Sequence, residues 1–425
     1  MRVTLAYGRE GLVADLPDQT DVVEPRDLPG VADEVAALRQ AMRSPVAGPA
    51  LRDLVPHGAR VGIVICDVTR PFPARRVLPV LLDELPSSAR VTVFVATGTH
   101  RACTPQELDS MLGPDLAASL HIVQHDAFDL GRHAYLGTAS TGAEAWIERE
   151  FLEQDVKILT GFIEPHFFAG FSGGPKMVCP GLAAIETVLH THGAPFIAHP
   201  NATWGITQGN PIHDEARAIA ALARPDFSLD VTLNKQHQIT AVFAGELFAA
   251  HAAGVRFAHE TAMAPVDRPY DVVVTTNSGY PLDQNLYQAV KGMSAAAQIV
   301  RPGGAILIAS ECADGLPDHG RYKDLLREAA GPEDFLARLN EPGFHVHDQW
   351  QVQVQAQIQR RARVLVKAAG VSAEQLQAAW FEAADDVSAT VEALGREHGP
   401  RVAALPQGPQ TIPYVRLQIG ATREH

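Results

Sequence analysis

Cysteines are scarce in this sequence, and long apolar runs are missing. The four cysteines among 425 residues lie far apart and form no Cys-x-x-Cys pair, which argues against zinc-ribbon and disulfide-scaffold proteins. No stretch approaches the roughly 18 uncharged apolar residues of a membrane span. The first residues also lack the basic segment and apolar stretch of a signal peptide. We therefore expect a cytoplasmic protein with reduced thiols and no membrane partner.

The sequence also has fewer basic than acidic residues. Lysine and arginine number 35 against 49 aspartates and glutamates, a formal net charge of −14, which argues against a general nucleic-acid or anionic-membrane binder. With 46% hydrophobic and 20% charged residues the composition is that of an ordinary globular protein. Because 425 residues exceed what one hydrophobic core usually holds, we expect two domains.

Three familiar cofactor motifs are absent. No strand-to-helix turn carries the Gly-x-Gly-x-x-Gly of a dinucleotide site, and no His-Glu-x-x-His of a zinc hydrolase occurs. Gly170 and Lys176 have the outer spacing of a phosphate-binding P-loop. However, Pro175 replaces its second glycine and Met177 its magnesium-binding hydroxyl, so we reject that interpretation.

What the sequence does contain is an alternation of short, branched apolar runs with helical patterns, which predicts an α/β fold with largely parallel sheets flanked by helices. We expect Pro79 to kink or shorten the first of these helices. The predicted strands are 61–66, 91–96, 156–159, 270–276 and 304–309, and the predicted helices are 74–85 and 284–300.

A second strand-and-helix series begins after Pro265, so we place a domain boundary there. The prediction is an N-terminal domain over residues 1–265 and a C-terminal domain over 266–407. A late strand over 413–419 follows a Pro/Gly/Gln-rich link, and residues 408–425 are expected to rejoin the first domain.

Polar chemistry collects where the predicted strands end, which is where open α/β sheets place ligands. Asp67, Thr69 and Arg70 follow one strand, and the run from Thr97 to Arg101, with His100, follows the next. Hydroxyls and glycine amides can hold a phosphate, and a guanidinium can clamp a carboxylate. Singly, each group is more often a plain turn or a structural ion pair. Together they favour a composite site.

The segment Glu164–Lys176 follows a third strand and combines His166, a Gly173-Gly174-Pro175 turn and Lys176. Histidine and lysine suit proton transfer, metal ligation or covalent attachment, and the residues alone leave all three open. Further imidazoles follow, any of which is a candidate ligand or a turn cap: His190, His192, His199 and His213.

At these positions the sequence resembles the LarA-type, nickel-pincer-nucleotide lactate racemases, a family of 2-hydroxyacid racemases and epimerases. The resemblance covers both predicted domains in matching order. Its motifs are Asp67–Pro71, Ala96–Arg101, Glu164–Gly181, His190–His192, Gly209–Pro211 and Pro281–Gly292.

The resemblance implies a pyridinium mononucleotide with two sulfur-bearing arms that hold nickel. One arm would be joined to Lys176, and His192 would complete the nickel coordination, with His190 as the less favoured neighbour. Sulfur and imidazole donors suit nickel. Further cofactor contacts are expected from Asp67, Thr69, Gly173 and Gly174. Maturation would need cofactor-synthesis enzymes as partners.

The implied reaction is an exchange of D and L enantiomers by hydride transfer through a 2-oxoacid. His100 and His166 are the expected catalytic bases on the two faces of the substrate. Arg70, Tyr287, Gln288 and Lys291 are the expected substrate contacts, in a cleft between the two domains.

The substrate itself is not set by these motifs. We favour a short-chain aliphatic 2-hydroxyacid such as lactate or 2-hydroxybutyrate. Two alternatives stay open: a sugar-acid 2-epimerase with the same cofactor, and a non-enzymatic nickel or nucleotide carrier.

Overall fold

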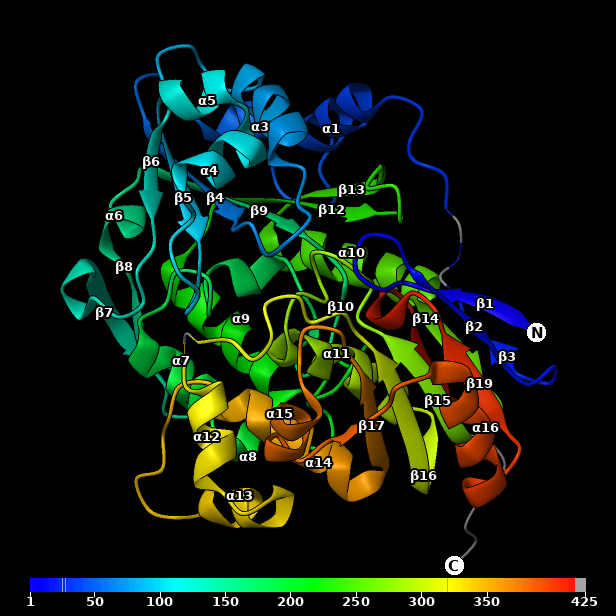
Figure 1. Ribbon diagram of the computed structural model, residues 1–425. Helices are drawn as coiled ribbons and strands as arrows, with labels where there is room; N and C mark the ends of the chain where they lie inside the picture. The colour runs from blue at the N-terminus through cyan, green and yellow to red at the C-terminus, as the bar shows by residue number, and fades with distance from the viewer. Residues whose placement is uncertain (25, 27, 319, 417–425) are drawn as a thin grey trace, which may run out of the picture. The chain divides into compact units, whose positions relative to one another are not determined.

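A computed structural model describes residues 1–416 apart from 25, 27 and 319, and the chain packs as two units (Figure 1). One unit spans residues 27–260, and the other joins residues 1–26 to the chain from 261 onward. The division between the units, at residues 260–261, lies close to Pro265. The prediction differs at the start of the chain, because the first 26 residues belong with the second unit.

The unit over residues 27–260 is built on a six-stranded sheet of order β13-β12-β9-β4-β5-β6. All neighbours are parallel except the antiparallel pair β12 and β13. The strands are β4 (Arg60–Cys66), β5 (Arg90–Ala96), β6 (His121–Gln124), β9 (Val156–Phe162), β12 (Phe227–Leu233) and β13 (Ile239–Gly245).

Strand β4 is buried along all but its first residue, and it pairs with β5 on one side and β9 on the other. Parallel strands end at the same edge of a sheet. The segments that follow these three strands therefore start from one edge, and they are the segments that carry most of the predicted site.

Smaller elements surround this sheet. The hairpins are β7 (His133–Thr138) with β8 (Glu144–Glu148), and β10 (Pro165–His166) with β11 (Gly170–Phe171). The helices are α1 (Glu34–Arg43), α2 (Leu51–Leu54), α3 (Ala74–Asp83), α4 (Pro105–Leu112), α5 (Pro114–Ser119), η1 (Leu130–Arg132), α6 (Arg149–Leu152), η2 (Gly174–Met177), α7 (Ile185–Thr191), α8 (Ala194–Ile197), α9 (Pro211–Ala223) and α10 (Leu247–Ala262).

The second unit has an all-parallel six-stranded sheet of order β18-β17-β16-β15-β19-β3. Its strands are β3 (Asp21–Val22), β15 (Tyr270–Thr276), β16 (Val300–Ala309), β17 (Arg363–Lys367), β18 (Glu382–Ala383) and β19 (Val402–Leu405). Its helices are α11 (Leu286–Ala297), α12 (Tyr322–Glu328), α13 (Pro332–Arg338), α14 (Gln349–Arg361), α15 (Ala373–Ala378), α16 (Val387–His398) and η3 (Gly408–Gln410).

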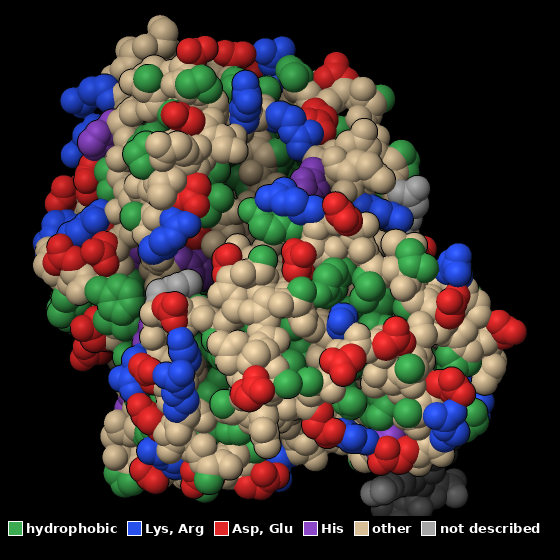
Figure 2. Space-filling model, in the orientation of Figure 1, with side chains coloured by type: hydrophobic (Ala, Val, Ile, Leu, Met, Phe, Trp, Pro, Cys, Tyr) green, Lys and Arg blue, Asp and Glu red, His purple; other side chains and the backbone are tan. Residues whose placement is uncertain are grey.

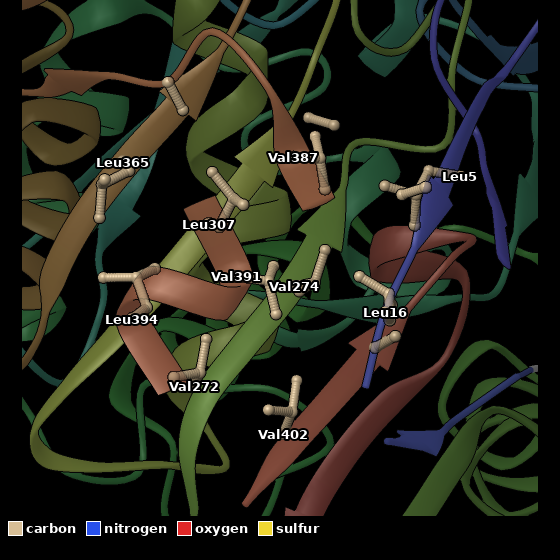
Figure 3. Close-up of a cluster of buried hydrophobic side chains, with 14 of the residues drawn as sticks. Leu5, Leu16, Val272, Val274, Leu307, Leu365, Val387, Val391, Leu394 and Val402 are labelled. Atoms are coloured by element: carbon tan, nitrogen blue, oxygen red, sulfur yellow. The ribbon is translucent and has the colours of Figure 1, made fainter. Parts of the chain in front are cut away.

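Alternate side chains of this sheet face opposite helices. On one face, Leu307 packs in a cluster with Val391 of α16 (Figure 3). On the other, Ile308 lies so close to Gly292 of α11 that a Cβ at Gly292 would come within 3.1 Å of it. Successive strand residues point to opposite faces, so α16 and α11 cover the two sides and the core has two layers.

The N-terminal residues belong to this second unit because they complete its core. The hairpin of β1 (Arg2–Leu5) and β2 (Leu12–Asp15) contributes Leu5 and Leu16, both buried, to the cluster shown in Figure 3. β3 then adds an edge strand by pairing with β19. Apolar burial, at about 25 cal/mol per Å², holds this segment to residues far along the chain.

The late strand also lies in the second unit. β20 (Ile412–Val415) pairs in parallel with β14 (Met263–Val266), so the expected return of residues 408–425 to the first domain differs from the structure. Residues 417–425, which include the end of the predicted 413–419 strand, lie outside the described residues.

The predicted α/β fold class, with parallel-dominated sheets and flanking helices, is confirmed. Pro79 lies inside α3 without ending it. All four cysteines are free and buried. Among the described residues no helix is long and apolar enough to cross a membrane. On the face shown in Figure 2, acidic and basic side chains are interspersed.

Candidate active site

Asp67 and His100 form a hydrogen-bonded pair at the ends of β4 and β5. Asp67 Oδ2 lies 2.7 Å from His100 Nδ1, and Asp67 Oδ1 accepts from the Thr69 hydroxyl at 2.6 Å. Because an ionised carboxylate only accepts, Nδ1 of His100 carries the proton. The lone pair of neutral His100 is then on Nε2, which is the nitrogen available for proton transfer.

The carboxylate of Asp67 is held in its ionised form. Burial alone would raise the pKa of Asp67, but the hydrogen bond from His100 and the nearby charge of Arg70 outweigh burial and lower this pKa. Arg70 is anchored in turn by donating to the backbone and hydroxyl oxygens of Thr69 at 3.2 Å. Four residues predicted as separate contacts, Asp67, Thr69, Arg70 and His100, therefore form one network.

His166 has the opposite tautomer to His100. It is buried in the β10–β11 hairpin, and its Nδ1 lies 3.3 Å from the backbone N–H of Ala169. Because Nδ1 accepts in this contact, a neutral His166 ring carries its proton on Nε2. The two predicted bases thus present different groups: a lone pair at His100 and an N–H at His166.

Three predicted site residues lie beside the ring of Phe168. The His166 ring centroid lies 4.6 Å from that of Phe168, and the His192 centroid 5.2 Å from it, both in edge-on contacts. The Nζ atom of Lys176 lies 5.6 Å from the same ring centroid. The sequence offered no signal for Phe168 beyond its position in the Glu164–Lys176 segment.

Lys176 lies in η2 and has an unusual amine. Burial, together with the charge of Arg70, lowers the pKa of Lys176 to about 8. A substantial fraction of this amine is therefore neutral near physiological pH, and a neutral amine is a nucleophile. The residue is suited to covalent attachment of a cofactor arm.

His192 follows the last turn of α7 and is buried. Burial and the charge of Lys176 lower the pKa of His192 to about 3, so its ring is neutral. Thr191 Oγ1 donates to the Val188 carbonyl and lies 3.0 Å from His192 Nδ1. With that hydroxyl accepting from Nδ1–H, the lone pair of the neutral His192 ring is on Nε2. The residue fits the predicted role of nickel ligand.

Protein packing accounts for the paired glycines. Gly173 and Gly174 have positive φ values of 74° and 48°, and a Cβ at Gly174 would come within 2.5 Å of His251. The Gly174 N–H donates to Asp230 Oδ1 at 3.1 Å. The glycines are needed for close approach to α10 and β12, whereas their predicted contact with a cofactor stays a prediction.

Sequence reasoning missed a layer of buried polar residues beneath this segment. Asp230 interrupts the apolar strand β12, which was a usable signal, and His251 lies in α10 and faces the carbonyl of Ser172 at 2.9 Å. Glu215 of α9 is fully buried, and neither of its carboxylate oxygens has a hydrogen-bond partner. None of these residues occurs in a motif.

The remaining predicted contacts lie in the second unit, at the start of α11. Asn285 caps this helix by accepting from the backbone N–H of Gln288 at 3.0 Å. Lys291 Nζ donates to the Gln288 side chain at 2.7 Å, which fixes both side chains one turn apart. The Tyr287 ring packs against Tyr322. Tyr287, Gln288 and Lys291 are all partly exposed.

Comparison with known families covers most of the chain. Residues 7–205 match the lactate racemase N-terminal domain, and residues 266–412 match the lactate racemase C-terminal domain. The chain is 37% identical over 373 residues to a lactate racemase of Thermoanaerobacterium thermosaccharolyticum, covering 86% of this chain and 87% of the relative. It is 33% identical to a lactate racemase of Lactiplantibacillus plantarum over 96% of this chain and 98% of the relative.

Solved structures agree. The lactate racemase apoprotein from T. thermosaccharolyticum superposes with a TM-score of 0.92 at 34% identity, covering 98% of this chain and all of that one. A Thermotoga maritima protein, at 18% identity and a TM-score of 0.72, covers 92% of this chain and all of that one, and shares the fold. The chain therefore belongs to the lactate racemase family, a family of isomerases.

Proposed function

We propose that this protein interconverts the D and L enantiomers of a short-chain aliphatic 2-hydroxyacid, such as lactate or 2-hydroxybutyrate, with a nickel-pincer nucleotide. The observation that carries the proposal is the convergence of Lys176 and His192 on Phe168. The neutral fraction of the Lys176 amine suits covalent tethering, and the neutral His192 ring suits nickel. When bound, the cofactor supplies a reversible acceptor for the Cα hydride.

His100 takes the hydroxyl proton of one enantiomer in this proposal. Asp67 fixes the ring so that Nε2 is the accepting atom, and the buried carboxylate stabilises the imidazolium that forms. Loss of the hydroxyl proton and the Cα hydride leaves a 2-oxoacid. Return of the hydride to its other face, with a proton to the oxygen, gives the mirror-image product.

His166 serves the other enantiomer. To accept a proton at Nε2 its ring must adopt the opposite tautomer and give up the contact from Ala169. That contact, at 3.3 Å, is long for a hydrogen bond to nitrogen and is therefore weak. Arg70 is the proposed carboxylate anchor within this unit, and Tyr287, Gln288 and Lys291 remain proposed substrate contacts.

The test is the mass of the protein produced together with cofactor-synthesis enzymes. We expect an adduct on Lys176 and racemisation of enantiopure lactate on a chiral column, both absent in Lys176→Ala. An active protein without the adduct would overturn the covalent proposal. Turnover of sugar acids but not of lactate would indicate an epimerase, and nickel binding without any change of optical rotation would indicate a carrier.

A further inference from the structure

A second group of histidines lies beside the loop that carries His100, after the edge strand β6. His125 follows β6, His133 begins β7 and Glu148 ends β8. Each is at most 2% exposed, and one ring nitrogen of each histidine and a carboxylate oxygen of Glu148 lie within 4.8 Å of one another. His133 and Glu148 are directly opposed in the β7–β8 ladder.

Backbone carbonyls fix the tautomers of both rings. His125 Nε2 lies 3.1 Å from the carbonyl of Ala183, and His133 Nδ1 lies 2.9 Å from the carbonyl of Asp129. A carbonyl only accepts, so each of these nitrogens carries the proton. In the neutral rings the lone pairs are therefore on Nδ1 of His125 and Nε2 of His133.

Both lone pairs lack a donor. His125 Nδ1 faces Glu148 Oε2 at 3.4 Å, and an ionised carboxylate has no proton to give. His133 Nε2 is buried and has no hydrogen-bond partner. An unpaired buried acceptor costs about 1–3 kcal/mol, and a cation held between the three side chains would satisfy the unpaired Nε2 of His133.

We propose that His125, His133 and Glu148 form a binding site for a divalent cation such as Zn²⁺, separate from the nickel site. Two imidazoles and a carboxylate are zinc ligands. Bonds of about 2.0–2.1 Å in a tetrahedral site place ligand atoms about 3.3 Å apart, close to the observed 3.4 Å. Carbonyl acceptors on the outer ring nitrogens are the usual support for ligating histidines.

Arg132 competes with the cation. Its guanidinium donates to the same Glu148 oxygen at 3.0 Å, and its side chain is 31% exposed. Because it reaches solvent, Arg132 is able to turn outward when a cation enters. The cost of that displacement weakens the site, and removal of the guanidinium is expected to strengthen it.

The cation would join two segments of the candidate active site. The Thr97 hydroxyl, in the loop that carries His100, donates to the His125 carbonyl at 2.8 Å. The Ala183 carbonyl that accepts from His125 lies between Lys176 and α7, the helix that ends before His192. The proposed cation is therefore structural, and through His125 it supports both segments.

The test uses protein made without cofactor-synthesis enzymes, free of affinity tags, in a His192→Ala background that removes the nickel ligand. After chelation and reloading with Zn²⁺, we expect one retained zinc per chain. His133→Gln should weaken zinc binding at least tenfold, and Arg132→Gln should tighten it. The exposed His121, beside Glu150 at 3.3 Å, supplies the control His121→Gln, which should change nothing.

Failure of the parent protein to retain zinc, or equal zinc in the His133→Gln variant, overturns the proposal. If His133→Gln does not fold, anomalous diffraction at the zinc edge on the parent protein decides the matter. A peak between His125 and His133 supports the proposed site, and a zinc bound elsewhere contradicts the proposal. Neither result depends on racemisation, so the proposed function is tested separately.

Discussion

The two buried histidine groups of the first unit differ in the charge of their neighbours. His192 lies beside Lys176, and that positive charge helps to keep its ring neutral. His125 and His133 instead face the carboxylate of Glu148. A positive charge beside a neutral imidazole disfavours a bare cation, and the proposed nickel would arrive with its own anionic sulfur ligands. Imidazoles next to a carboxylate suit a bare divalent ion.

The largest expected effect separates these two groups. His192→Ala should remove nickel and lower racemisation by at least ~10³-fold, the scale of losing an essential catalytic group, while zinc at the second site stays. His190→Ala is the matched control, and it should retain nickel and most of the activity. Chiral chromatography and metal analysis measure both. Nickel loss in the His190 variant alone would reverse the assignment.

A smaller effect is expected when the carboxylate beside His100 is neutralised. Asp67→Asn removes the acceptor that fixes the His100 tautomer, so kcat should fall about a hundredfold or more. KM should hardly change, because Asp67 acts through His100. Steady-state kinetics separate the two constants, with the exposed Asp109→Asn as control. A rise in KM with kcat intact would make Asp67 a binding residue instead.

Packing beneath the lysine segment predicts a change in stability. Gly174→Ala should lower the free energy of unfolding by about 1–3 kcal/mol more than Gly58→Ala. Both glycines have positive φ, but a Cβ at Gly58 meets nothing within 4 Å, whereas one at Gly174 meets His251. Denaturant melts of the two variants give the difference. Equal losses would show that backbone strain alone sets the requirement.

The smallest expected effect is a shift in reactivity with pH. Lys176 in the cofactor-free protein should react with a limiting acylating reagent half-maximally near pH 8, because the amine is charged below its pKa and neutral above it. Free N-acetyl-lysine should need a pH near ~10.4. Arg70→Leu should move the Lys176 midpoint upward, and peptide mass spectrometry follows it. An unmoved midpoint would exclude Arg70 as a cause of the lowered pKa.

Much of the fold could be predicted from sequence because its strands are short branched runs. The strand over 270–276 has the predicted bounds, and β4 and β5 begin one residue before theirs. The place of residues 1–26 could not be predicted, because β3 is two residues long and its partner β19 lies near the other end of the chain. No local sequence pattern indicates a strand pairing between residues so far apart in the chain.

The candidate site also contains residues that the sequence predicts and residues that only the structure brings together. Asp67, His100, Lys176 and His192 follow strands or belong to a motif, and the geometry groups the first two in one hydrogen-bonded pair and the last two around Phe168. The ligands proposed for zinc come from three separate elements at irregular spacing. Only the folded chain shows that one possible ligand atom of each lies within 4.8 Å of the others.

The pairing of β3 with β19 has a consequence for the order in which the chain folds. Residues 21–22 pair with residues 403–404, so during synthesis the sheet of the second unit stays open at that edge until residues 403–404 have left the ribosome. Residues 27–260 face no such delay and are able to fold as they emerge. Lys176 and His192, the residues proposed to hold the cofactor, would then be in place before the second unit is complete.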